Sequence, residues 1–336
     1  MSKLRVGLIG CGKRGRRHAG GYAKSDEVEI VACADPNADA VDTVKQEFGV
    51  TSTYDDYHKM LKSEPLDIVS TCLWPKLHLD SILAAADAGV QLINAEKPMA
   101  CTYGESVKMH EACERAGILL TFSHQRRFGA RFITARQLAQ DGAIGKLTRL
   151  EGFCPNLFDW GTHWFDMLFF YNNQTPVEWV MGQINVVRKA SVFGAPLETH
   201  GLSFFHYENG VSGMLVTGKD YNGGCQNRLI GTDGIIEVDN ETVRMLRAGG
   251  DGWETPDLSD LCKAETETEL YILDSIAALR EGYDPEVSSR KALMATELIF
   301  ATYESARRRA RVYLPLDIED SPLISMLESG QITIPE

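Results

Sequence analysis

Short runs of apolar residues recur along the first 123 residues of the chain. They occupy residues 4–9, 29–34, 67–71, 90–94 and 118–122. Apolar residues in consecutive positions over such short runs are typical of strands buried on both faces of a parallel sheet. The segments between them have the length of helices, and after Pro75 an apolar stripe with spacings of three and four residues is formed by Leu79, Ile82, Leu83 and Ala86. This alternation predicts an α/β domain with a doubly wound parallel sheet and right-handed crossovers.

The pattern changes after residue 123. A helix is expected at residues 127–141, then strands near 147–153, 177–187, 202–207, 211–217, 226–230 and 235–238, and helices near 267–280 and 289–308. The Asn209-Gly210 pair between two of these strands is typical of a two-residue hairpin loop. We therefore expect an α+β domain with a large, mostly antiparallel sheet over residues 124–336. Its tail after Pro315 shows little periodicity and is expected to be extended.

Composition and charge narrow the class of protein. The length of 336 residues suits two domains, and 44% apolar with 24% charged residues is typical of a globular protein. The formal net charge of −13 argues against nucleic acid or an anionic membrane as a partner, because both require a basic face. No signal peptide or transmembrane run is recognisable, and the eight cysteines form no C-x-x-C pair. Reduced thiols in a cytoplasmic protein are expected.

A glycine-rich hexapeptide follows the first apolar run and opens a helical segment. Its sequence is Gly10-Cys11-Gly12-Lys13-Arg14-Gly15, a G-x-G-x-x-G pattern. The first glycine permits a tight turn, the second allows the backbone to approach a pyrophosphate, and the third permits close packing of helix on strand. The free N–H groups and the helix dipole then face the phosphate charge. A glycine-rich turn without a ligand is the alternative, and the strand–turn–helix context favours a Rossmann dinucleotide site over residues 1–123.

The nature of the dinucleotide depends on Asp35, which ends the second predicted strand twenty positions after Gly15. A carboxylate at this place accepts hydrogen bonds from both ribose hydroxyls and repels a 2′-phosphate, which favours NAD over NADP. Two alternatives stay open. Asp35 could only cap the next helix with Pro36 in its first turn, and Arg14 could pair with a 2′-phosphate.

Four further residues are expected at the carboxyl ends of the parallel strands, where open α/β sheets bind their ligands: Trp74, His78, Glu96 and Lys97. Pro98 disfavours helix at Lys97. A lysine ammonium beside the nicotinamide is suited to stabilise a developing alkoxide. Alternatively, Glu96 and Lys97 are ordinary exposed charges and His78 caps the following helix.

The second domain contains a dense group of polar and aromatic residues from Asp159 to Asp166. On a helix, Asp159 and His163 share a face at i, i+4, and a carboxylate beside an imidazole raises the basicity that a general base requires. His163 and Asp166 form an H-x-x-D half-site for a metal, but no third ligand has matching spacing, and no metal is predicted. A histidine buried in an aromatic cluster with Trp160 and Trp164 is the structural alternative.

Taken together, these segments resemble the Gfo/Idh/MocA family, which includes glucose–fructose oxidoreductase and inositol dehydrogenase. The resemblance covers nearly the whole chain. It rests on VGLIGCGKRGRRHAGGY, VACADPN, LHLDSILAAADAGVQLINAEKPMA, the D-x-x-x-H of Asp159 and His163, GTDGIIEVD and FATYESARRRARVYLPL. All of these motifs in this order are more specific than any one of them.

The resemblance implies an activity and roles for the open residues. In the family, the lysine of E-K-P and the histidine of D-x-x-x-H flank the substrate beside the nicotinamide. His163 would therefore take a proton from a substrate hydroxyl, Asp159 would orient the imidazole or bind substrate, and Lys97 would polarise the oxygen while hydride passes to NAD. The implied protein is an NAD-dependent oxidoreductase acting on a sugar, polyol or related hydroxyl compound.

Two departures bear on the substrate. CPNLF replaces the glycine triplet that often precedes the aspartate, and Trp74 stands where many members have a small residue. A tryptophan there could stack on a sugar or narrow the pocket. For this reason no single substrate is predicted.

Other functions within the family stay open. One is cleavage of a glycoside through transient oxidation of a sugar carbon, and another is a non-catalytic NAD-binding regulator, against which intact Lys97, Asp159 and His163 argue. Family members cover the open sheet of the second domain by pairing sheets, which implies a homodimer or homotetramer.

Overall fold

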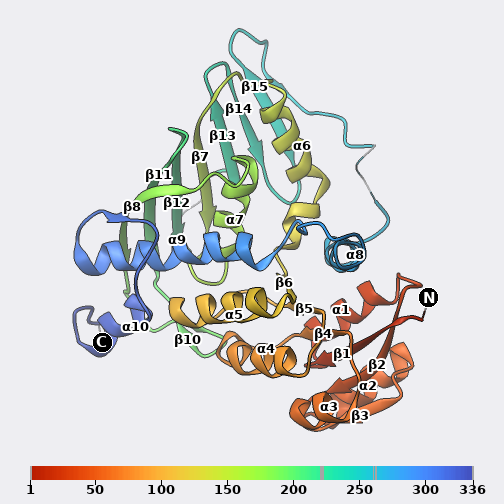
Figure 1. The fold of residues 1–336 in the computed structure, drawn as a ribbon. Helices are drawn as coiled ribbons and strands as arrows, with labels where there is room; N and C mark the ends of the chain where they lie inside the picture. Colours follow the sequence, from red (N-terminus) through yellow and green to blue (C-terminus); the bar gives the residue numbers. More distant parts are fainter. Residues whose placement is uncertain (1, 220–222, 260, 262, 335–336) are drawn as a thin grey trace. The chain divides into compact units, whose positions relative to one another are not determined.

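Two units make up the computed structural model, which describes residues 2–219, 223–259, 261 and 263–334 (Figure 1). The first unit contains Met1–Gln125 and Ala264–Leu293, and the second contains Arg126–Lys263 and Met294–Glu336. The chain therefore leaves the first unit after Gln125 and returns to it for one segment. The hydrophobic pattern, which divides the chain once between residues 123 and 124, gives no indication of this return.

A six-stranded parallel sheet forms the centre of the first unit. Its strands are β1 (Leu4–Ile9), β2 (Val28–Ala34), β3 (Ser52–Tyr54), β4 (Ile68–Thr71), β5 (Leu92–Ala95) and β6 (Leu119–Phe122), in the order β3-β2-β1-β4-β5-β6. Strand order reverses between β1 and β4, so that the sheet is doubly wound and the ends of β1 and β4 border the crevice where such sheets bind ligands. The predicted α/β Rossmann class is confirmed.

Helices flank this sheet in the sequence positions that the crossovers require. They are α1 (Lys13–Tyr22), α2 (Ala38–Phe48), α3 (Tyr57–Ser63), α4 (His78–Asp87), α5 (Tyr103–Ala116) and, from the returning segment, α8 (Glu267–Glu281). Local capping sets several of their bounds. The Thr266 side chain and Glu269 form a reciprocal capping box at the start of α8, and Gly282 ends it in the left-handed conformation.

The returning segment completes the first unit. A Cβ at Gly21 of α1 would lie 2.8 Å from Ile272 of α8, so the two helices are in close contact. The Tyr271 hydroxyl lies 3.0 Å from Thr121 Oγ1, and the Phe122 N–H donates to Val287 O at 3.1 Å. Residues 264–293 thus pack on both α1 and β6.

A nine-stranded mixed sheet dominates the second unit, in the order β16-β15-β14-β13-β7-β12-β11-β8-β17. The strands are β7 (Leu147–Cys154), β8 (Val177–Asn185), β11 (His200–Tyr207), β12 (Ser212–Gly218), β13 (Asn227–Gly231), β14 (Gly234–Val238), β15 (Val243–Arg247), β16 (Trp253–Glu254) and β17 (Val312–Tyr313). Only β7 and β12 pair in parallel, and the remaining neighbours are antiparallel. A separate hairpin joins β9 (Ser191–Val192) to β10 (Ala195–Pro196). The predicted α+β domain with a large, mostly antiparallel sheet is confirmed.

Alternating burial along β11 shows how the large sheet is covered on one face. Phe205 and Tyr207 are buried against rings of α7 (Gly161–Tyr171), and Ser203 Oγ lies 2.8 Å from Thr302 Oγ1 of α9 (Ser289–Arg308). The intervening Leu202 and Phe204 are 43% and 37% exposed. One face of the sheet is therefore helix-covered and the other carries apolar side chains at the surface.

Three local expectations need correction. The helix predicted at residues 127–141 begins later, as α6 (Ala130–Gln140) after a short 3-10 turn (Gln125–Phe128). The hairpin between β11 and β12 has a three-residue loop, because Tyr207 N–H donates to Val211 O and Gly210 takes a left-handed φ of 86°. The tail after Pro315 contains α10 (Pro322–Glu328), where a proline in the first turn starts the helix.

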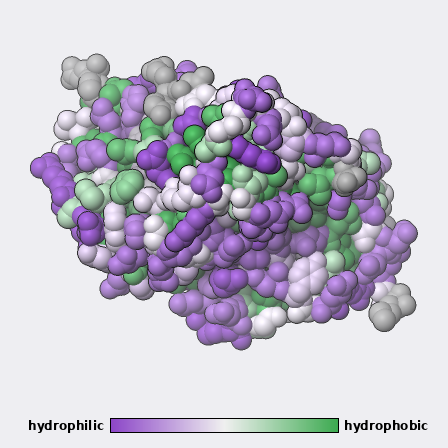
Figure 2. Space-filling model, turned by 90° about the horizontal axis from the view of Figure 1, so that it is seen from above, coloured by the Kyte–Doolittle hydropathy of each residue, from purple (hydrophilic) through white to green (hydrophobic). Residues whose placement is uncertain are grey.

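The face shown in Figure 2 is largely hydrophilic, with hydrophobic areas between the hydrophilic side chains. None of the described helices is long and apolar enough to cross a membrane.

Candidate active site

The glycine-rich loop between β1 and α1 has one open glycine and two that the packing requires. A Cβ at Gly10, where φ is +92°, would lie 2.7 Å from Cys72 O, and a Cβ at Gly15 would lie 1.9 Å from Gly10 O. At Gly12 a Cβ would meet nothing within 4 Å, although this residue is the N-cap of α1 and has no side-chain cap. The first turn of α1 therefore presents uncapped N–H groups beside an unfilled space, which suits a pyrophosphate.

Asp35 fastens this loop to the end of β2. Its Oδ2 accepts the Cys11 N–H at 2.8 Å and its Oδ1 accepts the Asn37 N–H at 2.8 Å. The N-cap of α2 is Asn37, whose side chain accepts from two amides of the first turn. Asp35 is thus not the cap itself, and its carboxylate lies at the loop, where a ribose is bound in Rossmann folds.

Glu96 is buried under the glycine-rich helix and is not an ordinary exposed charge. Its Oε1 lies 3.3 Å from His18 Nε2 and 3.8 Å from Arg14 Nη1. Burial alone would raise the pKa of Glu96, but His18 and then Arg14 lower it below its ordinary value. Burial lowers the pKa of His18, while Cys72 and Glu96 raise it to about 10. The first unit therefore holds a charged pair, and Arg14 faces Glu96.

The loops after β4 and β5 are joined by His78. Its Nδ1 lies 2.9 Å from Met99 O and its Nε2 lies 3.1 Å from Leu73 O, with the ring fully buried. Burial lowers the pKa of His78, although the contacts with main-chain oxygens oppose this shift. Both ring nitrogens contact main-chain oxygens, which makes His78 a support for the loops that carry Trp74 and Lys97.

Trp74 and Lys97 lie just beyond the ends of the neighbouring strands β4 and β5. Trp74 is 52% exposed and precedes the 3-10 turn Pro75–Leu77, with Lys76 Nζ 5.5 Å from its ring centre. Lys97 lies two residues after the end of β5 and is joined to Pro98 by a cis peptide bond. The Glu96 N–H donates to Thr71 O at 3.0 Å, which aligns the two strand ends.

In the second unit, Asp159 lies in a turn and not on the helix that carries His163. α7 begins at Gly161, with Trp160 as N-cap. The reason is Asn156, whose Oδ1 accepts the N–H groups of Asp159 at 2.7 Å and Trp160 at 3.2 Å, while its backbone oxygen accepts from Gly161 at 2.8 Å. This turn, residues 156–160, is called the Asn156 turn below. Asp159 and His163 still come from one continuous segment.

Asp166, the other member of the predicted half-site, belongs to a buried ion pair. Arg127 donates to Asp166 through Nε at 2.7 Å and Nη2 at 2.8 Å, and both side chains are almost fully buried. The guanidinium also lies 5.4 Å from the Phe170 ring. Asp166 is therefore structural, and the described residues contain no group of three or more His, Cys, Asp or Glu side chains that could hold a metal ion.

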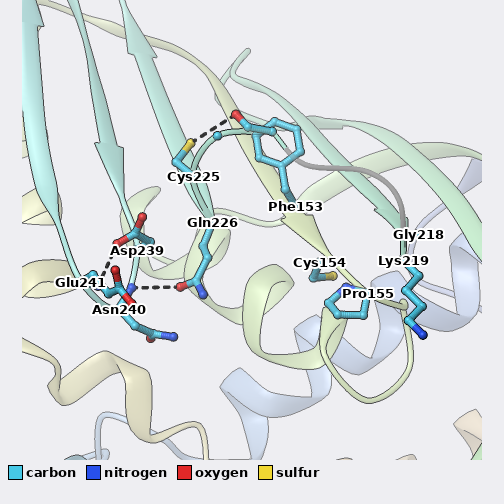
Figure 3. A pocket seen from close by; sticks show the side chains of 12 residues that line it. Phe153, Cys154, Pro155, Gly218, Lys219, Cys225, Gln226, Asp239, Asn240 and Glu241 are labelled. Carbon is cyan, nitrogen blue, oxygen red and sulfur yellow. Dashed lines mark hydrogen bonds between the residues drawn. The ribbon is translucent and has the colours of Figure 1, made fainter.

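A polar hollow of about 460 Å³ opens at the ends of β7, β12 and β14, directly before the Asn156 turn (Figure 3). Its polar side chains include Lys219, Gln226, Asn240 and Glu241. Gln226 Oε1 accepts the Asn240 N–H at 3.1 Å, and Figure 3 shows Cys154 and Pro155 on the side that leads into the turn.

The described cysteines are all free thiols, and Cys262 lies outside the described residues. Burial raises the pKa of Cys113 to about 11, so this thiol is protonated at neutral pH.

Two residues of the site, His18 and Asn156, were not predicted from the sequence. For Asn156, the available signal was an asparagine five residues before the start of a helix. For His18, no local sequence pattern indicates a buried histidine that contacts Glu96.

The fold and the loop define a class: a dinucleotide-binding protein with a Rossmann unit. Residues 4–124 match the model of the oxidoreductase family with an NAD-binding Rossmann fold, GFO_IDH_MocA. Over these residues the chain matches the Gfo/Idh/MocA family, as the resemblance of its motifs implied, and its cofactor is NAD, as the sequence predicted.

The relatives extend the match over the rest of the chain. The chain is 27% identical to D-apiose dehydrogenase of Paraburkholderia graminis, covering 99% of this chain and 95% of the relative. It is 24% identical to myo-inositol 2-dehydrogenase of Thermotoga maritima, covering 93% and 98%. Among solved structures, levoglucosan dehydrogenase in complex with NADH and levoglucosan has a TM-score of 0.80 at 20% identity, over 94% of this chain and all of the other. These relatives are dehydrogenases, and the structural likeness shows the same fold.

Proposed function

We propose that the chain is an NAD-dependent dehydrogenase that oxidises a hydroxyl-bearing carbon of a sugar or polyol. The observation that carries this is a complete set of parts within the two units: an open Gly12 beside uncapped amides, Lys97 at the end of β5, and Asp159 with His163 in one held segment. The two relatives that match nearly the whole chain are named as dehydrogenases of D-apiose and of myo-inositol.

Each residue has a defined role in this proposal. The loop from Gly10 to Gly15, including Lys13 and Arg14, binds the pyrophosphate, and Asp35 binds the ribose. His163 takes the proton of the substrate hydroxyl, Asp159 orients the imidazole or binds substrate, and Lys97 stabilises the developing alkoxide. The nicotinamide supplies the hydride acceptor.

NAD is preferred over NADP on two grounds. The Asp35 carboxylate would repel a 2′-phosphate at the ribose. Arg14, the residue with which a 2′-phosphate could pair, has its guanidinium 3.8 Å from buried Glu96.

The polar hollow beside the Asn156 turn is the proposed place for the hydroxyl-rich part of the substrate. Its volume is within the range of small-molecule pockets, and amide, ammonium and carboxylate groups around it match a polyhydroxylated compound. Within the first unit, Trp74 has an exposed aromatic face of the kind that stacks on a sugar ring.

The test is incubation with NAD and a panel of polyols, aldoses and glycosides, with NADH absorbance and product mass followed together. NADH formed with a polyol or aldose is the expected result. Glycoside cleavage without net NADH would support the transient-oxidation alternative. The absence of both NADH formation and glycoside cleavage would contradict the proposal. We expect His163→Ala to lower turnover about a hundredfold or more, while the control His206→Ala on β11 leaves it unchanged.

We also propose that the chain is a homodimer or homotetramer. Met181, Leu202 and Phe204 are 50%, 43% and 37% exposed on the uncovered face of the large sheet and border a groove with Arg309 and Ala310. Contiguous apolar surface of this kind is typical of an interface. Light scattering should give at least twice the mass of 37.2 kDa, and Leu202→Glu should lower it.

A further inference from the structure

A buried carboxylate lies behind the Asn156 turn. Glu198, in the connection between β10 and β11, is 2% exposed. Its Oε1 accepts the backbone N–H of Leu157 at 2.5 Å, with Thr217 Oγ1 at 3.4 Å, and its Oε2 accepts the hydroxyl of Tyr303 at 2.6 Å. Three neutral donors from three separate parts of the second unit therefore meet on one carboxylate.

The backbone on either side of Glu198 is fixed. The Leu197 N–H donates to Ala190 O and the Thr199 N–H donates to Asn185 O, both at 2.9 Å. Tyr303 is 1% exposed within α9. Glu198 thus reaches the turn from a rigid base, and a rigid base is what a positioning contact requires.

Leu157 is held by its side chain as well as by its amide. The side chain is fully buried and lies over Gly201 of β11, where a Cβ would come within 2.9 Å of Leu157 Cδ1. The amide contact with Glu198 and the packing against Gly201 fix the position and the direction of this residue.

If Leu157 were displaced, Asp159 and His163 would be displaced with it. Its neighbour Asn156 holds the amides of Asp159 and Trp160, and Gly161 begins the helix that carries His163. Between Leu157 and Asp159 there is only Phe158, which is itself buried.

We infer that Glu198 is a positioning residue for the proton-transfer group: it fixes the Asn156 turn and, through the turn, the places of Asp159 and His163. The inference rests on the proposed dehydrogenase function. Glu198 touches neither substrate nor cofactor in this role, and acts through the Leu157 amide.

The test compares Glu198→Ala, Glu198→Gln and a control, Glu304→Gln. Glu304 is an equally buried carboxylate on α9, but it pairs with Arg307 and Arg308. Gln keeps an oxygen for the Leu157 amide and places an NH₂ group at the Tyr303 hydroxyl, so it should rescue what Ala loses. Glu198→Asp, shorter by one methylene, replaces Glu198→Ala if that variant does not fold.

Two readouts are measured on each full-length variant: hydrogen exchange of residues 156–163, and kcat, KM and NAD affinity with a substrate from the panel. We expect Glu198→Ala to lose exchange protection in this segment and about tenfold or more in kcat, with NAD affinity unchanged. Glu198→Gln should retain both protection and kcat, as should Glu304→Gln. Unchanged protection in Glu198→Ala, or lost protection with unchanged kcat, would overturn the inference.

The exchange readout separates the two proposals. If the wild-type chain oxidises nothing in the panel, the proposed function fails. Loss of exchange protection confined to residues 156–163 in Glu198→Ala would then still support the inference that Glu198 fixes the Asn156 turn. Unchanged protection in this segment would overturn that inference.

Discussion

Gly12 offers a direct test of how the glycine-rich loop meets the cofactor. A methyl group at this position would meet nothing within 4 Å in the protein, and its φ of −69° is open to any residue. Gly12→Ala should therefore fold normally, with a loss of about 1 kcal/mol or less from replacing glycine by alanine at an N-cap. The same methyl group would occupy the space through which the backbone approaches the pyrophosphate.

The expected magnitude follows from ligand linkage. At an NAD concentration 100 times the dissociation constant, the wild-type chain should gain about 2.7 kcal/mol in unfolding free energy. A tenfold weaker complex would gain only about 1.4 kcal/mol at the same concentration. We expect Gly12→Ala to weaken NAD binding at least this much, which for a chain of 336 residues corresponds to a difference of about 2 °C in the NAD-dependent rise of Tm.

Thermal unfolding with and without NAD measures both effects in one experiment. Gly20→Ala, later on α1, is the matched control, because a Cβ there has only Glu269 Oε1 as a neighbour, at 4.0 Å. Gly15→Ala should behave differently from both and lose stability without NAD, since its Cβ would lie 1.9 Å from Gly10 O. If NAD raised the Tm of Gly12→Ala as much as that of the wild type, the assignment of this glycine to the pyrophosphate would be wrong.

Three other predictions concern charged groups. Asp35→Ala should raise the kcat/KM ratio of NADP to NAD, measured with one substrate; an unchanged ratio would remove Asp35 from the ribose site. Asp166→Asn should lower the urea-unfolding free energy by about 3–5 kcal/mol, because it leaves the buried Arg127 uncompensated. Cys72 and Glu96 raise the pKa of His18 from 6.5 to about 10, so its charged contacts stabilise the fold fully below about pH 6.5 and this contribution is lost as the pH rises through 10. His18→Gln should therefore show a weaker stability loss between pH 7 and pH 10, and an identical loss would contradict the raised pKa of His18.

The strands of the first unit could be predicted because short runs of consecutive apolar residues leave little alternative to a strand buried on both faces of a sheet. β3 (Ser52–Tyr54) was missed, since it has three residues, none of them fully buried. The glycine-rich loop was predictable for the same local reason as the strands, because the turn, the helix start and the close packing all act within six residues.

The candidate site of the second unit was predictable only in part. The i, i+4 spacing of Asp159 and His163 placed both on a helix, but Asn156 draws the amides of the preceding turn to its own side chain and delays the helix to Gly161. The contact of Glu198 with Leu157 joins residues 41 positions apart, and neither residue stands in a motif. Such contacts depend on how β11 and α9 pack and have no local pattern.

The return of residues 264–293 to the first unit has a consequence for how the protein is made. α8 packs on α1, and Val287 and Ser288 pair with β6, so the nucleotide-binding fold is complete only after most of the second unit has left the ribosome. Until then, the apolar surface of α1 around Gly21 has no helix over it. A nascent chain released early would expose that surface. Protein expressed as residues 1–123 alone should therefore aggregate during synthesis, whereas co-expression with a segment spanning 264–293 should restore its solubility.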